Sequence, residues 1–386
     1  MNEVALYNWS PVLQVMFVGM SIAIGPLVWV WLKSRNAPLA KRLRTLTWVT
    51  LFLTFDLVIF GAFTRLTDSG LGCPDWPGCY GSASPIGAQS QIQAAQSALP
   101  GGPVTFPKAW IEMIHRYLAT GVGVLILILA VWSWLERKRI SISPWWPTLT
   151  LVWVCLQGAF GALTVTMKLF PAIVTMHLLG GMALLTLLKI QSVKYAQASG
   201  ELQHVQLPAG THRLMLATFA LLWFQIALGG WVSTNYAVLA CTDFPACQNS
   251  FWPAMNFKEA FTLWRELGAG RDGDNISFQA LTAIHYVHRL SAYVVFAAIG
   301  LLVVKLLKVA ELRTSAKWLA GLALLQAATG LGNVLLGWPL AAAVLHTGGA
   351  AALVVVMTGM VCVSKTGRVV NTKLVANAQG LSRLPA

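Results

Sequence analysis

Four histidines of the chain form two pairs with similar spacing. The first member of each pair lies in a similar short motif, MIHRYLA at 113–119 or YVHRLSA at 286–292, and the second lies in MHLLGG or LHTGG. The pairs are His115 with His177 and His288 with His346. Two imidazoles that face each other across a bundle of helices can bind a heme iron from both sides. The spacing therefore favours two heme sites, one for each pair.

Zinc is the main competing ligand for such histidines. A structural zinc ion takes four close ligands, and neither pair has a carboxylate or thiol close enough to complete the set. Glycines near the histidines also leave room for a flat macrocycle, although glycines in membrane helices commonly serve helix packing. These glycines are Gly121, Gly123, Gly180, Gly181, Gly348 and Gly349.

An arginine directly follows the first histidine of each pair, as Arg116 and Arg289. A guanidinium near the membrane surface is a good partner for the propionates of a heme. A long basic side chain at this depth is also typical of an interface anchor, with its charge among the lipid headgroups. Both interpretations stay open from the sequence.

One position differs between the two motifs in a way that bears on chemistry. Three residues before the first histidine, the first motif has Glu112 and the second has His285. Residues at i and i+3 share a helix face, so we expect Glu112 to point toward the same cavity as His115. A carboxylate beside a buried macrocycle is costly unless it accepts or moves a proton. The difference predicts a reactive heme site in the first half and an electron-transfer heme in the second, unless Glu112 is only a hydrated interface residue.

Helices that cross a membrane must position these residues. Of the 386 residues, 56% are hydrophobic and 10% are charged, and the mean hydropathy is +0.65. Apolar stretches long enough to span a bilayer core of about 30 Å must be helical, because only helices satisfy the backbone there. The predicted spans are 12–32, 46–66, 110–134, 147–167, 172–190, 213–234, 281–304, 316–337 and 340–364. The sequence predicts an all-α integral membrane protein with about nine spans.

The net charge of +14 does not indicate nucleic-acid binding, because the basic residues gather on one side of the predicted membrane. They follow the first, third, fifth and seventh spans and occur in the C-terminal tail, and these segments hold 19 of the 27 Lys and Arg residues. The positive-inside rule makes this side cytoplasmic. We therefore expect the N-terminus outside, the C-terminus inside, and the long loops at about 67–109 and 235–280 outside.

Internal repeats divide the spans into two halves. CPDWPGC at 73–79 returns as CTDFPAC at 241–247, and QGAFGALTV at 157–165 resembles QAATGLGNV at 326–334, at offsets of 168 and 169 residues. We predict two tandem, pseudo-symmetric four-helix bundles in the same orientation, plus one extra N-terminal helix. The predicted boundaries are 1–45 for the extra helix and its basic loop, 46–194 and 213–364 for the bundles, 195–212 for a cytoplasmic linker and 365–386 for a cytoplasmic tail.

Each long outside loop carries two cysteines six residues apart, near its start. An oxidising periplasm permits disulfides, and four cysteines allow three pairings. The equal spacing and the short proline-containing loops favour the local pairs Cys73–Cys79 and Cys241–Cys247. A redox role for the thiols and a zinc clip built from both pairs are the alternatives, and the lack of a C-x-x-C spacing disfavours the clip.

Together these motifs closely resemble heme A synthases of the cysteine-containing bacterial type. The resemblance covers about residues 46–364 and rests on GAFTRLTDSGLGCPDWPGCYG, EMIHR, TMHLLGG, HYVHR and LHTGG. It implies an oxidoreductase of the bacterial inner membrane that oxidises one methyl group of heme O to a formyl group, giving heme A for cytochrome oxidase. The family pattern has eight spans, so the first helix of this chain is an addition whose role the resemblance does not explain.

The resemblance also implies roles for individual residues. His115 and His177 match the pair that binds the substrate heme, and His288 and His346 match the axial ligands of a heme b cofactor. Glu112 matches the glutamate thought to take part in the oxidation, by stabilising positive charge on the methyl group or by moving protons.

The implied partners are heme O, the heme O synthase that supplies it, membrane lipid and an electron donor, either a quinol or a redox protein. A homo-oligomer is left open. Two other functions would use the same four histidines: a diheme cytochrome b that only passes electrons, and a heme transporter or chaperone. A cytochrome b would not need Glu112 on the face of one heme site.

Overall fold

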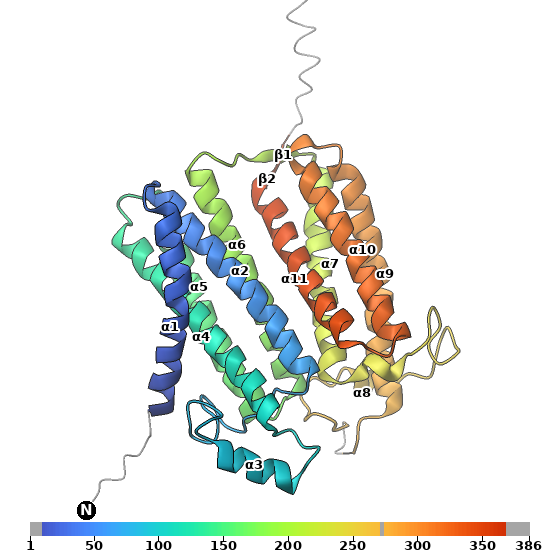
Figure 1. The fold of residues 1–386 in the computed structure, drawn as a ribbon. Coiled ribbons are helices and arrows are strands. Elements are labelled where there is room, and N and C mark those ends of the chain that lie inside the picture. The colour runs from blue at the N-terminus through green and yellow to red at the C-terminus, as the bar shows by residue number, and fades with distance from the viewer. Residues whose placement is uncertain (1–9, 271–273, 368–386) are drawn as a thin grey trace, which may run out of the picture.

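The computed structural model describes residues 10–270 and 274–367. Within these residues, nine helical stretches are long and apolar enough to cross a membrane (Figure 1). The helices are α1 (Ser10–Ser34), α2 (Leu39–Leu66), α4 (Phe106–Leu135), α5 (Trp145–Thr166), α6 (Pro171–Ala198), α7 (Ala209–Thr234), α9 (Phe278–Leu306), α10 (Arg313–Leu335) and α11 (Leu340–Val363). The predicted all-α membrane fold is confirmed. The predicted tail lies outside the described residues from 368 onward.

Short elements fill the connections between these helices. The first long loop contains α3 (Gln89–Ala98), and the second contains the 3-10 turn η1 (Ala237–Ala240) and α8 (Phe257–Ala260). A second 3-10 turn, η2 (Ala310–Leu312), precedes α10. Helix α6 continues to Ala198, into the segment expected to be a linker. The strands β1 (Val205–Leu207) and β2 (Ser364–Thr366) then pair in parallel, which joins the connection after α6 to the end of α11.

The helices form two groups of four that lie side by side (Figure 1). The first group is α2, α4, α5 and α6, and the second is α7, α9, α10 and α11. The groups meet through their first and fourth helices, because α6 contacts both α7 and α11, and α2 contacts α11. Helix α1 packs on the outside of the first group against α4. The two helices approach closely at Gly19, where an added Cβ would lie 2.4 Å from Thr120 Cγ2.

The two groups also share backbone details. The second helix of each begins at a hydroxyl N-cap: Thr105 accepts from Lys108 N at 3.3 Å, and Ser277 accepts from Ala280 N at 3.2 Å. Such caps satisfy N–H groups that have no partner within the helix. The turn before each fourth helix contains two consecutive left-handed residues, 168–169 with φ of 50° and 61° and 337–338 with φ of 66° and 64°. The offset is again 169 residues, so the repeat in the sequence is also a repeat in conformation.

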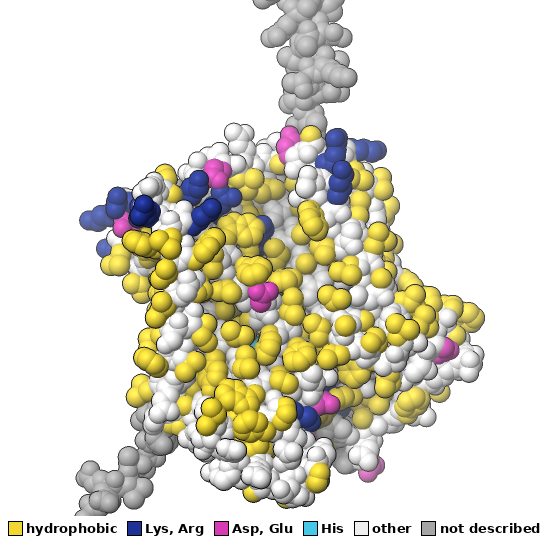
Figure 2. Space-filling model, viewed as in Figure 1, with side chains coloured by type: hydrophobic (Ala, Val, Ile, Leu, Met, Phe, Trp, Pro, Cys, Tyr) yellow, Lys and Arg dark blue, Asp and Glu magenta, His cyan; other side chains and the backbone are white. Residues whose placement is uncertain are grey.

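Charge distinguishes the two ends of the molecule. Figure 2 shows Lys and Arg side chains gathered mainly at one end, over the ends of α1, α9 and α10. We call this the basic end, and we call the opposite end, with residues 73–79 and 241–247, the Cys-loop end. The separation agrees with the topology expected from the positive-inside rule.

Candidate functional site

The structure brings the two members of each histidine pair together. His115 on α4 lies close enough to His177 on α6 for the two rings to interact electrostatically, and the same holds for His288 on α9 and His346 on α11. All four side chains are half-buried. Each pair therefore joins the second and fourth helices of one four-helix group, as the repeat predicted.

A glycine on a neighbouring helix lies directly against the first histidine of each pair. Gly61 on α2 faces His115, and Gly229 on α7 faces His288. A Cβ built on either glycine would lie 3.0 Å from Cε1 of the ring. These contacts bring the first helix of each group against its imidazole.

The second histidine of each pair has the same kind of neighbour. Gly161 on α5 faces His177 and Gly330 on α10 faces His346, with an added Cβ 3.3 Å from Cε1 in both cases. All four helices of a group therefore contribute to its histidine pair. Sequence reasoning missed these four glycines, although Gly161 and Gly330 stand at the same place in the repeated motifs QGAFGALTV and QAATGLGNV.

Several of the glycines expected to make room for a macrocycle lie elsewhere. Gly121 faces Ile22 of α1, where an added Cβ would lie 3.1 Å from Ile22 Cγ2. Gly180 faces the amide of Gln157, and Gly349 faces the amide of Gln326. The expectation was wrong for Gly121, because α1 covers that face of α4.

We expect Gly229→Ala to alter the absorption spectrum and the EPR g-values of heme bound in the second half. The added methyl group would meet the His288 ring at 3.0 Å, so the ring must move. Gly330→Ala is expected to have a smaller effect, because its methyl group would lie 3.3 Å from His346. Gly321→Ala, on α10 with nothing within 4 Å of the added Cβ, is the control. Identical spectra for Gly229→Ala and Gly321→Ala would contradict the contact.

Two glutamines lie against the Nδ1 atoms of histidines. Gln157 Nε2 on α5 is 3.1 Å from His177 Nδ1, and Gln225 Nε2 on α7 is 3.1 Å from His288 Nδ1. Each amide nitrogen also donates to the backbone carbonyl of the same histidine. A glutamine on a neighbouring helix therefore holds each of these two imidazole rings at Nδ1, the ring nitrogen that does not usually bind iron.

The other two histidines differ from each other. Thr329 Oγ1 on α10 is 3.0 Å from His346 Nδ1. His115 Nδ1 is buried and has no hydrogen-bond partner among the described residues. The His115 ring instead stacks on Phe60, with 6.2 Å between ring centroids and 14° between planes.

The residues present fit a heme in each half. Nδ1 is the nitrogen held at 3.0–3.1 Å by Gln157, Gln225 and Thr329, and Gln225 Nε2 lies farther, at 3.5 Å, from His288 Nε2. A histidine held through one ring nitrogen presents the other to a metal in a fixed orientation. No group of three or more His, Cys, Asp or Glu side chains with a metal-binding arrangement occurs within residues 10–270 and 274–367.

Glu112 lies near the histidines but is hydrogen-bonded to residues 73–79, which we call the first Cys loop; residues 241–247 are the second. The residue as a whole is only 4% exposed, and its carboxylate accepts from Cys73 N at 2.8 Å and from the Arg116 guanidinium. Arg116 also donates to the carbonyls of Asp75 at 2.9 Å, of Pro77 at 3.2 Å and of Gly78. The Glu112–Arg116 ion pair therefore fastens the loop to α4.

The second half repeats this arrangement with a neutral residue in place of the carboxylate. Arg289 donates to Asp243 O at 2.8 Å, to Cys241 O at 2.8 Å and to His285 Nε2 at 3.2 Å. His285 Nδ1 lies 3.1 Å from Ala237 O, so the ring donates there and accepts from Arg289. Both arginines hold loop carbonyls in this structure, and a contact with heme propionates remains a prediction.

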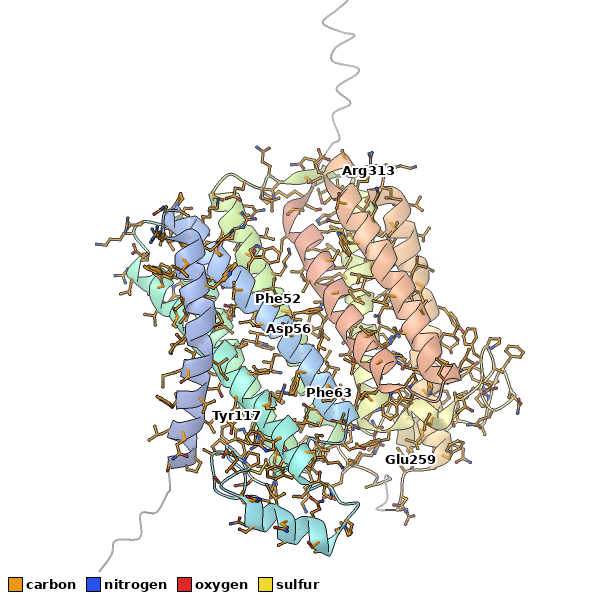
Figure 3. The ribbon with its side chains drawn as sticks, in the orientation of Figure 1. Phe52, Asp56, Phe63, Tyr117, Glu259 and Arg313 are labelled. Atoms are coloured by element: carbon orange, nitrogen blue, oxygen red, sulfur yellow. A yellow bond between two sulfur atoms is a disulfide. The ribbon has the colours of Figure 1, made fainter. Side chains whose placement is uncertain are left out.

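The Cys loops themselves are compact turns. Disulfides join Cys73 to Cys79 and Cys241 to Cys247, as the spacing predicted. The Asp243 carboxylate accepts from Gln248 N at 2.8 Å and from Asn249 N at 2.9 Å. These two N–H groups, that of Asn249 more strongly than that of Gln248, hold the pKa of Asp243 below its ordinary value. Asp75 makes the equivalent pair of bonds in the first loop. Tyr117, labelled in Figure 3, donates from its hydroxyl to Ala83 O and further ties α4 to the first long loop.

Comparison with known proteins agrees with this arrangement. The family described as cytochrome oxidase assembly protein matches residues 44–358. The chain belongs to this family. It is 36% identical to the heme A synthase of Shewanella oneidensis over 315 residues, which cover 81% of this chain and 94% of that protein. The heme A synthases of Caulobacter vibrioides and Sinorhizobium medicae are 28% and 29% identical, over 79% and 78% of this chain and 91% and 84% of their own lengths. The resemblance seen in the sequence is confirmed.

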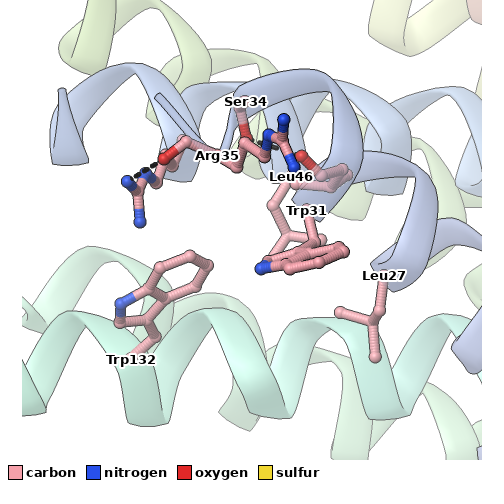
Figure 4. Close-up of a pocket in the computed structure, with 8 residues that line it drawn as sticks. Leu27, Trp31, Ser34, Arg35, Leu46 and Trp132 are labelled. Carbon is pink, nitrogen blue, oxygen red and sulfur yellow. Dashed lines mark hydrogen bonds between the residues drawn. The ribbon is translucent and has the colours of Figure 1, made fainter. Parts of the chain in front are cut away.

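The match to the cytochrome oxidase assembly protein family begins in α2, so α1 lies outside it. At the basic end, α1 is separated from α2 and α4 by a small pocket (Figure 4). Trp31 of α1 and Trp132 of α4 line it, and Arg42 donates across its rim to Arg35 O. None of the predicted site residues lines this pocket, so the extra helix is remote from the histidines at this end.

Asp56 is an acidic residue within α2, and neither its sequence context nor the family resemblance indicates a role for it. It is exposed, one turn from Phe52, which is 61% exposed (Figure 3). The corresponding residue 168 positions later is Phe224, which is 55% exposed. The structure gives no physical reason for a carboxylate at this position.

Proposed function

We propose that this chain is a heme A synthase, an oxidoreductase that converts one methyl group of heme O into the formyl group of heme A. The observation that carries the proposal is the presence of a histidine pair within each four-helix half of a chain from this family. The similarity to the heme A synthase of Shewanella oneidensis extends over most of both chains and supports the same activity.

We assign the substrate to the first half, between His115 and His177. Glu112 supports this assignment, because it is a buried carboxylate three residues from His115 and the second half has no counterpart to it. Its Oε2 accepts from Cys73 N, and its Oε1 accepts from Arg116. A carboxylate held in this way has a fixed position from which it can stabilise positive charge or take a proton.

We assign a resident heme b to the second half, between His288 and His346. Both rings there are held through Nδ1, by Gln225 and Thr329, which supports a permanent site. The bound heme would supply electron transfer. The residue in the place of Glu112 is His285, and its two nitrogens are already used by Ala237 O and Arg289, which supports a site without proton chemistry.

The membrane assignment is part of the same proposal. The gathering of Lys and Arg at the basic end supports an orientation in the bacterial inner membrane with the Cys loops on the periplasmic side. A heme O synthase would supply the substrate, and a quinol or a redox protein would supply or accept electrons.

Pigment analysis tests the function directly. The full chain is purified from one host that makes heme O and from another that lacks heme O synthase, and extracted hemes are identified by chromatography and mass. We expect heme A, heme O and heme b from the first host and heme b alone from the second. Heme b alone from both hosts would instead indicate a diheme electron carrier. Bound heme O without any heme A would indicate a transporter or chaperone.

A further inference from the structure

The four imidazoles differ in how they are held, and the difference does not follow the repeat. His177, His288 and His346 each have a polar side chain within 3.1 Å of Nδ1. His115 has none, and its Nδ1 is nevertheless buried. A buried nitrogen without a hydrogen bond is unfavourable, so one ring of the first site is held less favourably than the others.

The threonine fixes the tautomer of its histidine. Thr329 Oγ1 has one proton, which it donates to Leu325 O at 2.7 Å. The hydroxyl must therefore accept from His346 Nδ1–H, and Nε2 of this ring is left unprotonated and ready to bind a metal. His346 is thus prepared as a permanent ligand.

The glutamine at His288 serves the same purpose by turning its amide. Its Nε2 faces Nδ1, whereas its Oε1 is buried without a partner among the described residues. Rotation of the amide brings Oε1 to Nδ1–H when Nε2 of the histidine binds a metal, and it gives up the present bond from the amide nitrogen to His288 O. The ring then has a hydrogen-bond acceptor behind it.

The chain itself shows what replaces this glutamine in the first half. Gln225 lies four residues before Gly229, which contacts His288, and Leu57 lies four residues before Gly61, which contacts His115. Leu57 and Gln225 therefore occupy the same position in the repeat, at an offset of 168 residues. A leucine cannot accept a hydrogen bond, so His115 lacks the support that His288 receives.

We propose that His115 is the exchangeable ligand of the first heme site, while His177 stays bound, and that Leu57 is the positioning residue that makes it exchangeable. This inference rests on the proposed function. A synthase must release its product, whereas its cofactor must stay. Loss of a hydrogen-bond partner behind a metal-binding histidine typically lowers metal affinity by about 10–100-fold. The asymmetry thus gives the substrate site a ligand that detaches and the cofactor site two that do not.

Carbon monoxide tests the proposal because it binds reduced heme only where an axial ligand leaves. We would use the full chain in two backgrounds, His288→Ala/His346→Ala, which keeps only the first site, and His115→Ala/His177→Ala, which keeps only the second. Each is loaded with hemin, reduced with dithionite and mixed with carbon monoxide, and binding is followed by absorption. We expect the first site to react at least about 10-fold faster than the second.

Reciprocal substitutions at the equivalent positions give the decisive comparison. Leu57→Gln is expected to slow the reaction of the first site by about 10-fold or more, and Leu57→Met, which keeps an apolar side chain, is expected to leave it unchanged. Gln225→Leu should make the second site reactive, and Gln225→Met should do the same. The reduced spectrum of each variant, without carbon monoxide, reports whether both histidines are bound.

Equal rates for Leu57→Gln and Leu57→Met, with an unreactive second site in Gln225→Leu, would overturn the exchangeable ligand while leaving the synthase proposal intact. If Leu57→Gln does not fold, the Gln225→Leu and Gln225→Met pair decides alone, and an unreactive second site in both overturns the inference. A first-site protein that binds no hemin at all would overturn both this inference and the proposed heme site.

Discussion

Glu112→Gln is expected to abolish heme A formation while leaving the fold and the heme b spectrum unchanged. Glutamine retains an oxygen that can accept from Cys73 N, so the first Cys loop should stay in place. It carries no negative charge and cannot take a proton, and such groups commonly contribute about 10²–10⁴-fold to a rate. The measurement is the ratio of heme A to heme O in cells that supply heme O.

Two further variants separate chemistry from anchoring. Both Glu112→Gln and Glu112→Ala leave Arg116 without its counter-charge, but only Glu112→Ala also removes every acceptor for Cys73 N and Arg116, so we expect it to be the less stable of the two in addition to losing activity. His285→Gln changes the matched position of the second half, keeps an acceptor for Arg289, and is expected to retain heme A formation. A normal heme A yield from Glu112→Gln would show that the carboxylate serves only to hold the loop.

Arg116→Ala is expected to cause the largest loss of stability among the substitutions considered. Its side chain is 9% exposed and that of Glu112 is 5% exposed, so the change leaves a buried carboxylate without its partner. Removal of one partner from a buried ion pair typically costs about 3–5 kcal/mol. Three loop carbonyls of residues 75–78 also lose their donor.

Arg289→Ala is the matched variant in the second half and should cost less. It leaves the neutral His285 behind, so the expected loss is that of unsatisfied hydrogen bonds, about 1–3 kcal/mol. Thermal unfolding in detergent compares the two variants, and limited proteolysis reports which loop opens. If Arg289→Ala lost as much stability as Arg116→Ala, the negative charge of Glu112 would not be the reason why the two arginines are expected to differ.

The sequence predicts the spans and the histidine pairs well for a physical reason. Apolar length is a property of one contiguous segment, so the nine spans found in the described part of the chain are predictable without tertiary information. Repetition supplied the rest, because two copies of one unit must place His115 and His288 alike. The same logic predicted the disulfides, since Cys73–Cys79 and Cys241–Cys247 close loops within one motif.

The contacts around the site were not predictable in this way, because they join segments that are remote in the sequence. Glu112 was expected to face the His115 cavity, but its binding to Cys73 depends on how the loop after α2 folds back onto α4. Gly61 contacts His115 because α2 is oriented about its own axis so that this glycine faces the histidine on α4. No periodicity in one helix reports such a rotation relative to another.

The contacts between the two halves have a further consequence. Exchange of the halves maps α2 onto α7 and α6 onto α11, so the contact of α2 with α11 is equivalent to that of α7 with α6, and α6 with α11 is equivalent to itself. The same pattern of contacts occurs in the isologous interface of a two-fold dimer, where both protomers necessarily present the same residues. Because a single chain carries both copies here, that constraint is absent. Glu112 can therefore lie near the first histidine pair while His285 occupies the equivalent position near the second, so the two halves can share one fold and differ in chemistry.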